Sequence, residues 1–190
     1  SPADYVDRLK FLAGCYSNVS SVTHSITQRL GYGGNYNRAT NIIHEHNGYV
    51  LPLEDDWLLT KPLYLDPYVQ DMDDMEEWGC CGLTNVGWSY QQLAEYVGVN
   101  YRTYLYLLPE SKNQYVFSGN PRLEKVSWER KVGLWPEGLS PGMTEIAVCG
   151  IANARQGIVV PLWDYPAPFV TIGDIKSEWV EDANATAARA

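Results

Sequence analysis

The chain has 190 residues, with 14 Lys and Arg against 23 Asp and Glu, a formal net charge of −9, and 45 % hydrophobic residues. This apolar content is too high for an intrinsically disordered chain. The negative balance disfavours a general nucleic-acid binder, because affinity for phosphate comes mainly from Lys and Arg. One domain is the default at this length. We expect a β-rich domain over residues 1–180 and a mobile or extended tail over 181–190.

The first element in chain order is a predicted helix over residues 2–13. Tyr5, Leu9 and Leu12 recur there at helical spacing, and Gly14 follows as a stop signal. The glycine-rich segment 32–37 then predicts a flexible loop.

Strands account for most of the remaining chain. The chain has 14 Tyr, 7 Trp, 16 Gly and 11 Pro, a composition typical of half-buried strands joined by many turns. The predicted strands cover residues 20–28, 41–53, 99–108, 114–118, 123–134, 144–151, 157–163 and 169–172. The clearest is 99–108, where one face collects apolar side chains at every second position.

A second short helix is predicted after Ser89, which forms a capping-box pattern with Gln92, and Gly98 is its expected end. A Pro- and Gly-rich loop is predicted over 135–142. Together these elements indicate a mostly β fold, an antiparallel β-sandwich or jelly roll with one or two short helices.

No targeting or membrane segment is predicted. The chain has neither a basic start followed by an apolar run nor about 20 consecutive apolar residues. The absence of an initial Met fits release from a longer precursor, and a trimmed chain fits equally well.

The four cysteines are expected to be mainly reduced, structural thiols. Cys15 and Cys149 lie in apolar stretches that suit buried free thiols. The adjacent Cys80 and Cys81 have the wrong spacing for a zinc site. Disulfide pairing stays open at this point, because an even number of cysteines also suits a secreted chain.

The negative charge is concentrated in one segment. Residues 39–101 hold 11 acidic residues and a single base, Lys61, whereas the flanking parts are nearly neutral. Such a segment attracts cations or a basic partner surface, although a solvated acidic face is the simpler interpretation. A cation, a basic partner or a pH response is therefore expected to map to this segment.

His44 and His46 are the first candidate metal ligands. On a strand, alternate residues face the same side, and the pattern of His44, Glu45 and His46 resembles the start of a cupin metal motif. Surface or interface histidines that titrate near neutral pH are the alternative.

The acidic run over residues 71–77 is the second candidate. Ca²⁺ takes six to eight oxygen ligands, and Asp71, Asp73 and Asp74 are the weak candidates for a calcium site built with a neighbouring subunit. The EF-hand pattern fails, since Glu76 stands where the loop needs Gly. A solvated loop or short helical turn is the alternative, and no other cofactor is expected.

No motif for nucleophilic catalysis or nucleotide binding is present. We therefore expect no enzymatic activity. A sheet rich in Trp and Tyr, with acidic residues beside it, keeps a carbohydrate-binding or carbohydrate-cleaving module open.

Two stretches resemble parts of the capsid jelly rolls of picorna-like viruses. Residues 4–17 (DYVDRLKFLAGCYS) resemble the short helix that enters a strand in such subunits, and residues 157–166 (GIVVPLWDYP) are similar to a late strand that ends in Pro and aromatics. Residues 88–107 fit the same architecture as a short helix feeding an aromatic strand.

The resemblance implies a non-enzymatic structural protein, a viral capsid or other self-assembling shell subunit. Its partners would be copies of itself or related subunits, without nucleic-acid or membrane binding, and its location a virion or the extracellular space. Two alternatives remain: an extracellular carbohydrate-type β-sandwich module, and a cupin-like metalloenzyme that uses His44 and His46.

Overall fold

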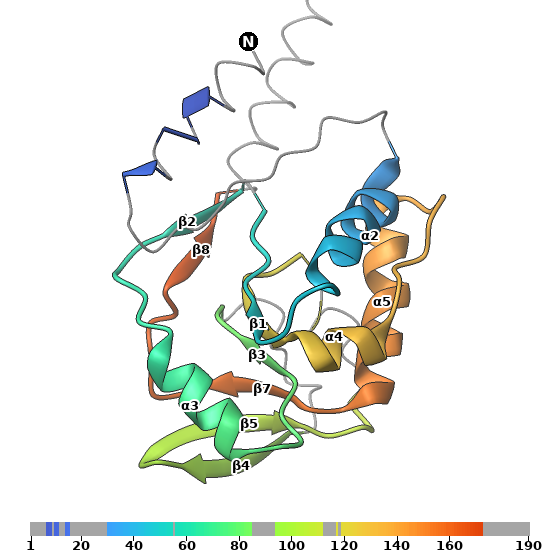
Figure 1. Cartoon of the computed structure of the whole chain (residues 1–190). Helices are drawn as coiled ribbons and strands as arrows, with labels where there is room; N and C mark the ends of the chain where they lie inside the picture. The colour runs from blue at the N-terminus through green and yellow to red at the C-terminus, as the bar shows by residue number, and fades with distance from the viewer. Residues whose placement is uncertain are drawn as a thin grey trace, which may run out of the picture. The chain divides into compact units, whose positions relative to one another are not determined.

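A computed structural model describes residues 7–8, 10–11, 14–15, 30–54, 56–84, 94–111, 117 and 119–172 (Figure 1). The chain divides into two compact units, Ser1–Leu30 and Gly31–Ala190. The described residues of the first unit are mostly helical, which confirms the predicted N-terminal helix at residues 7, 8, 10 and 11.

The second unit holds a six-stranded sheet of mixed direction. Its strand order is β1-β6-β3-β7-β5-β4, and β3 pairs with β7 in parallel while the other pairs are antiparallel. The strands of this sheet are β1 (Tyr49–Val50), β3 (Cys80–Gly82), β4 (Ala94–Val99), β5 (Arg102–Leu107), β6 (Arg122–Lys125) and β7 (Ile158–Pro161). A separate antiparallel pair joins β2 (Trp57–Leu59) to β8 (Phe169–Thr171).

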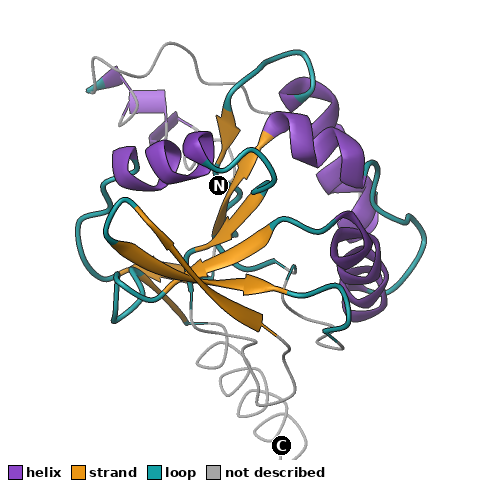
Figure 2. Cartoon of the chain, turned by 90° about the horizontal axis from the view of Figure 1, so that it is seen from below, coloured by secondary structure: helices purple, strands orange, loops and turns teal. Residues whose placement is uncertain are grey.

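Four helices complete the described part of this unit: α2 (Gly31–Ile43), α3 (Asp66–Asp74), α4 (Val126–Val132) and α5 (Pro141–Arg155). In Figure 1, α2, α4 and α5 lie together on one side of the strands and α3 lies away from them. Figure 2 shows the strands passing between the helices.

Alternating side chains on the central strands supply two hydrophobic cores. Cys80 and Ile158 face the core beneath α2, α4 and α5, whereas Cys81 and Val159 face the core beneath α3. Since successive residues of a strand point to opposite faces, the short apolar strands β3 and β7 are buried on both sides.

Three predicted strands are confirmed. Strands β5, β7 and β8 lie within residues 99–108, 157–163 and 169–172, although Val99 ends β4 and residues 100–101 form the turn before β5. The ranges 20–28 and 181–190 fall outside the described residues, as does 114–118 apart from Phe117, which is not in a strand. The loop over 135–142 is also confirmed up to Ser140, after which α5 begins.

Two predictions of local structure near α2 and α5 were wrong. Residues 32–37 belong to helix α2, and residues 144–151 belong to helix α5 instead of a strand. Gly33 is a packing requirement of α2, because a Cβ there would overlap the backbone of Pro136. In α5 the buried residues Thr144, Val148 and Ala152 recur every four positions, which is a helical period.

Three further predictions were wrong in part. The helix expected after Ser89 and ending at Gly98 is strand β4 where it is described, because Ala94–Val99 pairs along its whole length with β5 through a tight turn at Asn100 and Tyr101. Within 123–134 the strand ends at Lys125 and helix α4 follows. Within 41–53 only Tyr49 and Val50 are in a strand.

The expected β content is thus substantial, but the described strands do not clearly form a sandwich or a jelly roll. The main sheet contains a parallel pair, and helices pack against it. Among the described residues, no helix combines the length and the apolar character needed to cross a membrane.

Candidate functional site

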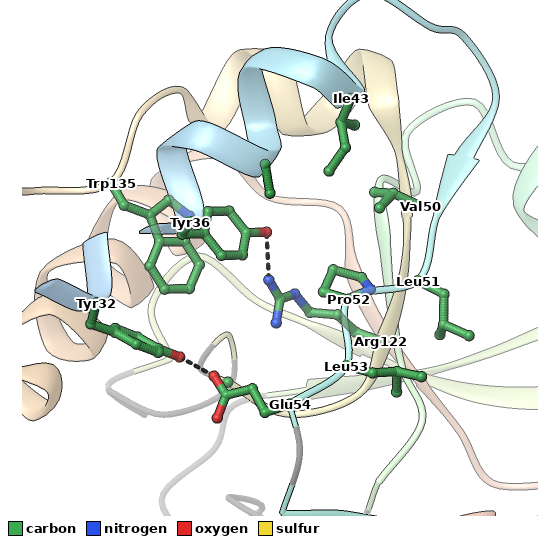
Figure 3. A pocket seen from close by; sticks show the side chains of 12 residues that line it. Tyr32, Tyr36, Ile43, Val50, Leu51, Pro52, Leu53, Glu54, Arg122 and Trp135 are labelled. Carbon is green, nitrogen blue, oxygen red and sulfur yellow. Dashed lines mark hydrogen bonds between the residues drawn. The ribbon is translucent and has the colours of Figure 1, made fainter. Parts of the chain in front are cut away.

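A cavity of about 260 Å³ lies between α2 and the segment that follows β1 (Figure 3). Its lining comes from sequence-distant parts of the second unit. The lining residues are Tyr32, Tyr36, Ala39, Ile43, Val50, Leu51, Pro52, Leu53, Glu54, Gly119, Arg122 and Trp135.

The residues of α2 that line the cavity follow the period of a helix. Tyr32, Tyr36, Ala39 and Ile43 are spaced by four, three and four residues, so that they share one face of the helix. The opposite wall is the extended segment from Val50 to Glu54, which is largely apolar. The wall from residues 50–53 is therefore aliphatic, whereas α2 contributes both tyrosines and aliphatic side chains.

One aromatic wall is held in place by Asn37. Its amide donates to the backbone oxygen of Trp135 at 2.9 Å, and its side-chain oxygen accepts from the Trp135 backbone nitrogen at 2.7 Å. The Trp135 ring then stacks on Tyr36 with centroids 3.7 Å apart. Because Asn37 is buried, these bonds fix the loop after α4 against α2.

The buried Arg122 forms the floor of the cavity. Its guanidinium pairs with Glu124, donates to the Tyr36 hydroxyl at 2.8 Å and lies 4.2 Å from the centroid of Phe117. Burial by itself would lower the pKa of Arg122, but the charge of Glu124 outweighs it and raises this pKa. The guanidinium stays charged, and its charge is balanced within the protein.

Glu54 provides a second charge at the edge of the cavity. The Tyr32 hydroxyl donates a short hydrogen bond to one of its oxygens (Figure 3). Burial raises the pKa of Glu54, the Tyr32 hydrogen bond lowers it in part, and the negative charges of Asp56 and Glu145 raise it further. Gly119 lies against this carboxyl, since a Cβ there would overlap its oxygens.

The two candidate histidines do not lie on a strand. Residues 44–46 form a turn after α2, so the alternation expected of a cupin-like pair is absent. His44 Nε2 contacts the buried carboxylate of Glu129, while His46 is exposed. Arg130 donates to the backbone oxygens of both histidines at 2.6 Å.

The three candidate aspartates lie on α3, and each accepts hydrogen bonds from neighbouring side chains. Asp71 is buried and binds Arg102, whereas Asp73 accepts a hydrogen bond from Tyr49 and Asp74 from Asn100. Asn100 also donates to Asp71 at 2.8 Å. Within the part of the chain that the structure describes, no group of three or more His, Cys, Asp or Glu side chains is placed to hold a metal ion.

The residues of the cavity were missed by sequence reasoning. Tyr32 and Tyr36 stand in a segment interpreted as a loop, and Arg122 opens a short strand. The one usable signal was the acidic segment, to which Glu54 belongs and where a bound cation was expected. Comparison with protein-family models, curated proteins and solved structures finds no match to this chain.

Proposed function

We propose that the protein is a non-enzymatic structural protein that assembles with copies of itself or with related subunits, as the subunits of a viral capsid or another shell do. The observation that carries this proposal is an exposed apolar surface, which we name the apolar ribbon. It consists of two adjacent antiparallel segments, residues 57–64 and 162–171.

Hydrogen bonds hold the two segments side by side beyond the paired strands. Leu58 pairs with Val170 in the β2–β8 register, the Thr60 backbone nitrogen donates to Pro168 at 2.9 Å, and Lys61 Nζ lies 2.5 Å from Asp164 Oδ1. The two segments therefore run side by side as one antiparallel ribbon.

The exposed side chains of the apolar ribbon are mainly large and apolar. Tyr64 and Tyr165 are 73 % and 79 % exposed, and Leu58 and Val170, directly opposite each other, are 51 % and 44 % exposed. Leu162 is exposed as well, as is Leu59 on the opposite face of β2. A solvated face of an antiparallel pair is normally polar, and contiguous exposed apolar surface marks interaction sites.

Charge favours a second copy as the partner. The chain carries a net charge of −9, yet the only charged residues of the ribbon, Lys61 and Asp164, neutralise each other. Two copies of this surface therefore meet without like-charge repulsion, and tyrosines are typical anchors of protein interfaces. The proposal rests on this surface and not on a jelly-roll form of the fold, which stays a prediction, as does a virion or extracellular location.

Sedimentation-velocity centrifugation of the full chain over a range of concentrations tests the proposal. We expect the wild type to associate and the double variant Leu58→Lys, Val170→Lys to need at least about a tenfold higher concentration, a loss of roughly 1.4 kcal/mol. Leu134→Lys is the matched control, because Leu134 is 58 % exposed and lies outside the ribbon. Circular dichroism checks that each variant is folded. A wild type that stays monomeric at all concentrations, or a control that dissociates equally, would overturn the proposal.

A further inference from the structure

The cavity beside α2 has the size and lining of a small-molecule site. Its volume of about 260 Å³ exceeds the roughly 150 Å³ that suffices to hold a benzene molecule in an apolar protein interior. Six of its lining residues are aliphatic or proline: Ala39, Ile43, Val50, Leu51, Pro52 and Leu53. A ligand with an apolar body gains by leaving water for this space.

The two charges at the cavity differ in how they are balanced. Arg122 is paired with Glu124 and also donates to Tyr36 and to the Asn120 backbone oxygen at 3.1 Å. Glu54, by contrast, receives a hydrogen bond from the neutral Tyr32 hydroxyl, and among the described residues no cation forms an ion pair with it. The charge at this site that has no ionic partner among the described residues is therefore the negative charge of Glu54.

The surroundings of Glu54 strengthen this imbalance. Asp56 and Glu145 lie close enough to raise the pKa of Glu54, and each acts on it more strongly than Arg122 does in lowering it. A ligand carboxylate would meet three acidic groups and an arginine that is already paired with Glu124. A ligand ammonium group would meet a half-buried carboxylate that otherwise accepts a hydrogen bond from a neutral hydroxyl, and a carboxylate attracts cations.

We propose that this cavity binds a small organic amine, with the ammonium group on the Glu54 carboxylate and the apolar body between α2 and the segment 50–54. The site is independent of the apolar ribbon, so this proposal and the assembly role stand or fall separately. Gly119 belongs to the site, because the absence of a side chain there leaves room for the carboxylate.

Isothermal titration calorimetry of the full chain at pH 7 with n-hexylamine, n-hexanol and hexanoate tests the proposal. These probes share the same apolar body and differ in the charge of the head group. We expect the wild type to bind hexylamine at least about tenfold more tightly than hexanol, the effect of one favourable charged contact, and hexanoate to bind most weakly.

Three variants locate the binding. Glu54→Gln keeps an acceptor for Tyr32 but removes the charge, and it is expected to abolish the preference for the amine over the alcohol. Ala39→Trp places a large side chain at an exposed lining position and is expected to weaken amine and alcohol alike. Glu110→Gln, at an exposed carboxylate outside the cavity, is the control and is expected to change neither.

Several results would contradict the proposal that the cavity binds an organic amine. Absence of saturable hexylamine binding would overturn the proposal. So would equal affinity for amine and alcohol in the wild type, tightest binding of hexanoate, or an amine preference that survives Glu54→Gln in a protein shown by circular dichroism to be folded.

Discussion

Asp71 is a fully buried carboxylate whose charge is satisfied entirely by side chains of the β4–β5 hairpin. Arg102 donates to it through Nε and Nη2 at 2.6 Å each, and Tyr104 and Asn100 donate as well. Asp71→Asn removes the charge that pairs with Arg102 and replaces one acceptor oxygen by an NH2 group that faces donors, so we expect it to lower the free energy of unfolding by about 2–4 kcal/mol. Urea denaturation measures this change.

Asp74→Asn is the matched control on the same helix. Asp74 is exposed and receives one hydrogen bond from Asn100, so its replacement is expected to cost less than about 1 kcal/mol. Equal effects of the two substitutions would show that the buried network does not stabilise the fold.

The Asp71→Asn variant is also expected to change how stability depends on pH. Burial would raise the pKa of Asp71, but hydrogen bonds from Arg102, Tyr104 and Asn100 outweigh it and hold this pKa below its ordinary value. The folded state thus binds fewer protons at this site than the unfolded state, and the contribution is complete above the ordinary pKa near 4. The stability difference between wild type and Asp71→Asn is expected to shrink below that pH.

At the scale of elements, sequence patterns placed the strands at 102–107, 158–161 and 169–171 correctly but mistook part of helix α5 for a strand. Residues 102–107 alternate and are a strand, whereas the run Ile146–Cys149 suits a strand or a helix equally well. The period of four from Thr144 to Ala152 was present in the sequence, but it becomes decisive only once the sheet and α4 supply a surface to cover.

Glycine misled the interpretation for a related reason. A glycine that permits a turn and one that permits close packing look alike in a sequence, and Gly33 and Gly79 are of the second kind. A Cβ on Gly79 would overlap the ring of Trp128, whose Nε1 donates to Gln156 at 2.7 Å.

Gly79→Ala tests this close approach between β3 and α4. Because Trp128 is buried against Phe117 and has no room to withdraw, we expect the substitution to lower the free energy of unfolding by about 2–3 kcal/mol. Gly98→Ala is the control, since a Cβ there meets nothing within 4 Å, and its effect is expected to stay within about 0.5 kcal/mol. A tolerated Gly79→Ala would contradict the packing argument.

At the scale of the whole molecule, the candidate site could not be predicted because it is assembled by the topology. Tyr32, Glu54 and Arg122 belong to a helix, a connecting segment and a strand, and no spacing in the sequence links them. Of these three residues only Glu54 lies in the acidic segment, where a cation, a basic partner or a pH response stays a prediction. The charge partner of Arg122 is its neighbour two positions on, Glu124, a pair that strand geometry places on one face.

The reactivity of the four cysteine thiols can be used to follow how the chain unfolds. All four are free; Cys15 is exposed, contrary to expectation, whereas Cys80, Cys81 and Cys149 are buried. Burial raises the pKa of all three buried thiols, that of Cys149 to about 12, and the thiolate is the reactive form. We therefore expect one thiol of four to react rapidly with an aromatic disulfide reagent at pH 8, and Cys15→Ser to remove this fast phase.

The slow phase then distinguishes one cooperative unit from two. Cys80 and Cys149 belong to the core beneath α5, whereas Cys81 belongs to the core beneath α3. Both cores share the strands β3 and β7, so neither opens without exposing the other, and we expect the three buried thiols to react at one common rate that rises with urea. Peptide mapping after partial labelling measures each rate. Labelling of Cys81 while Cys149 stays protected would show instead that the two faces of the sheet unfold independently.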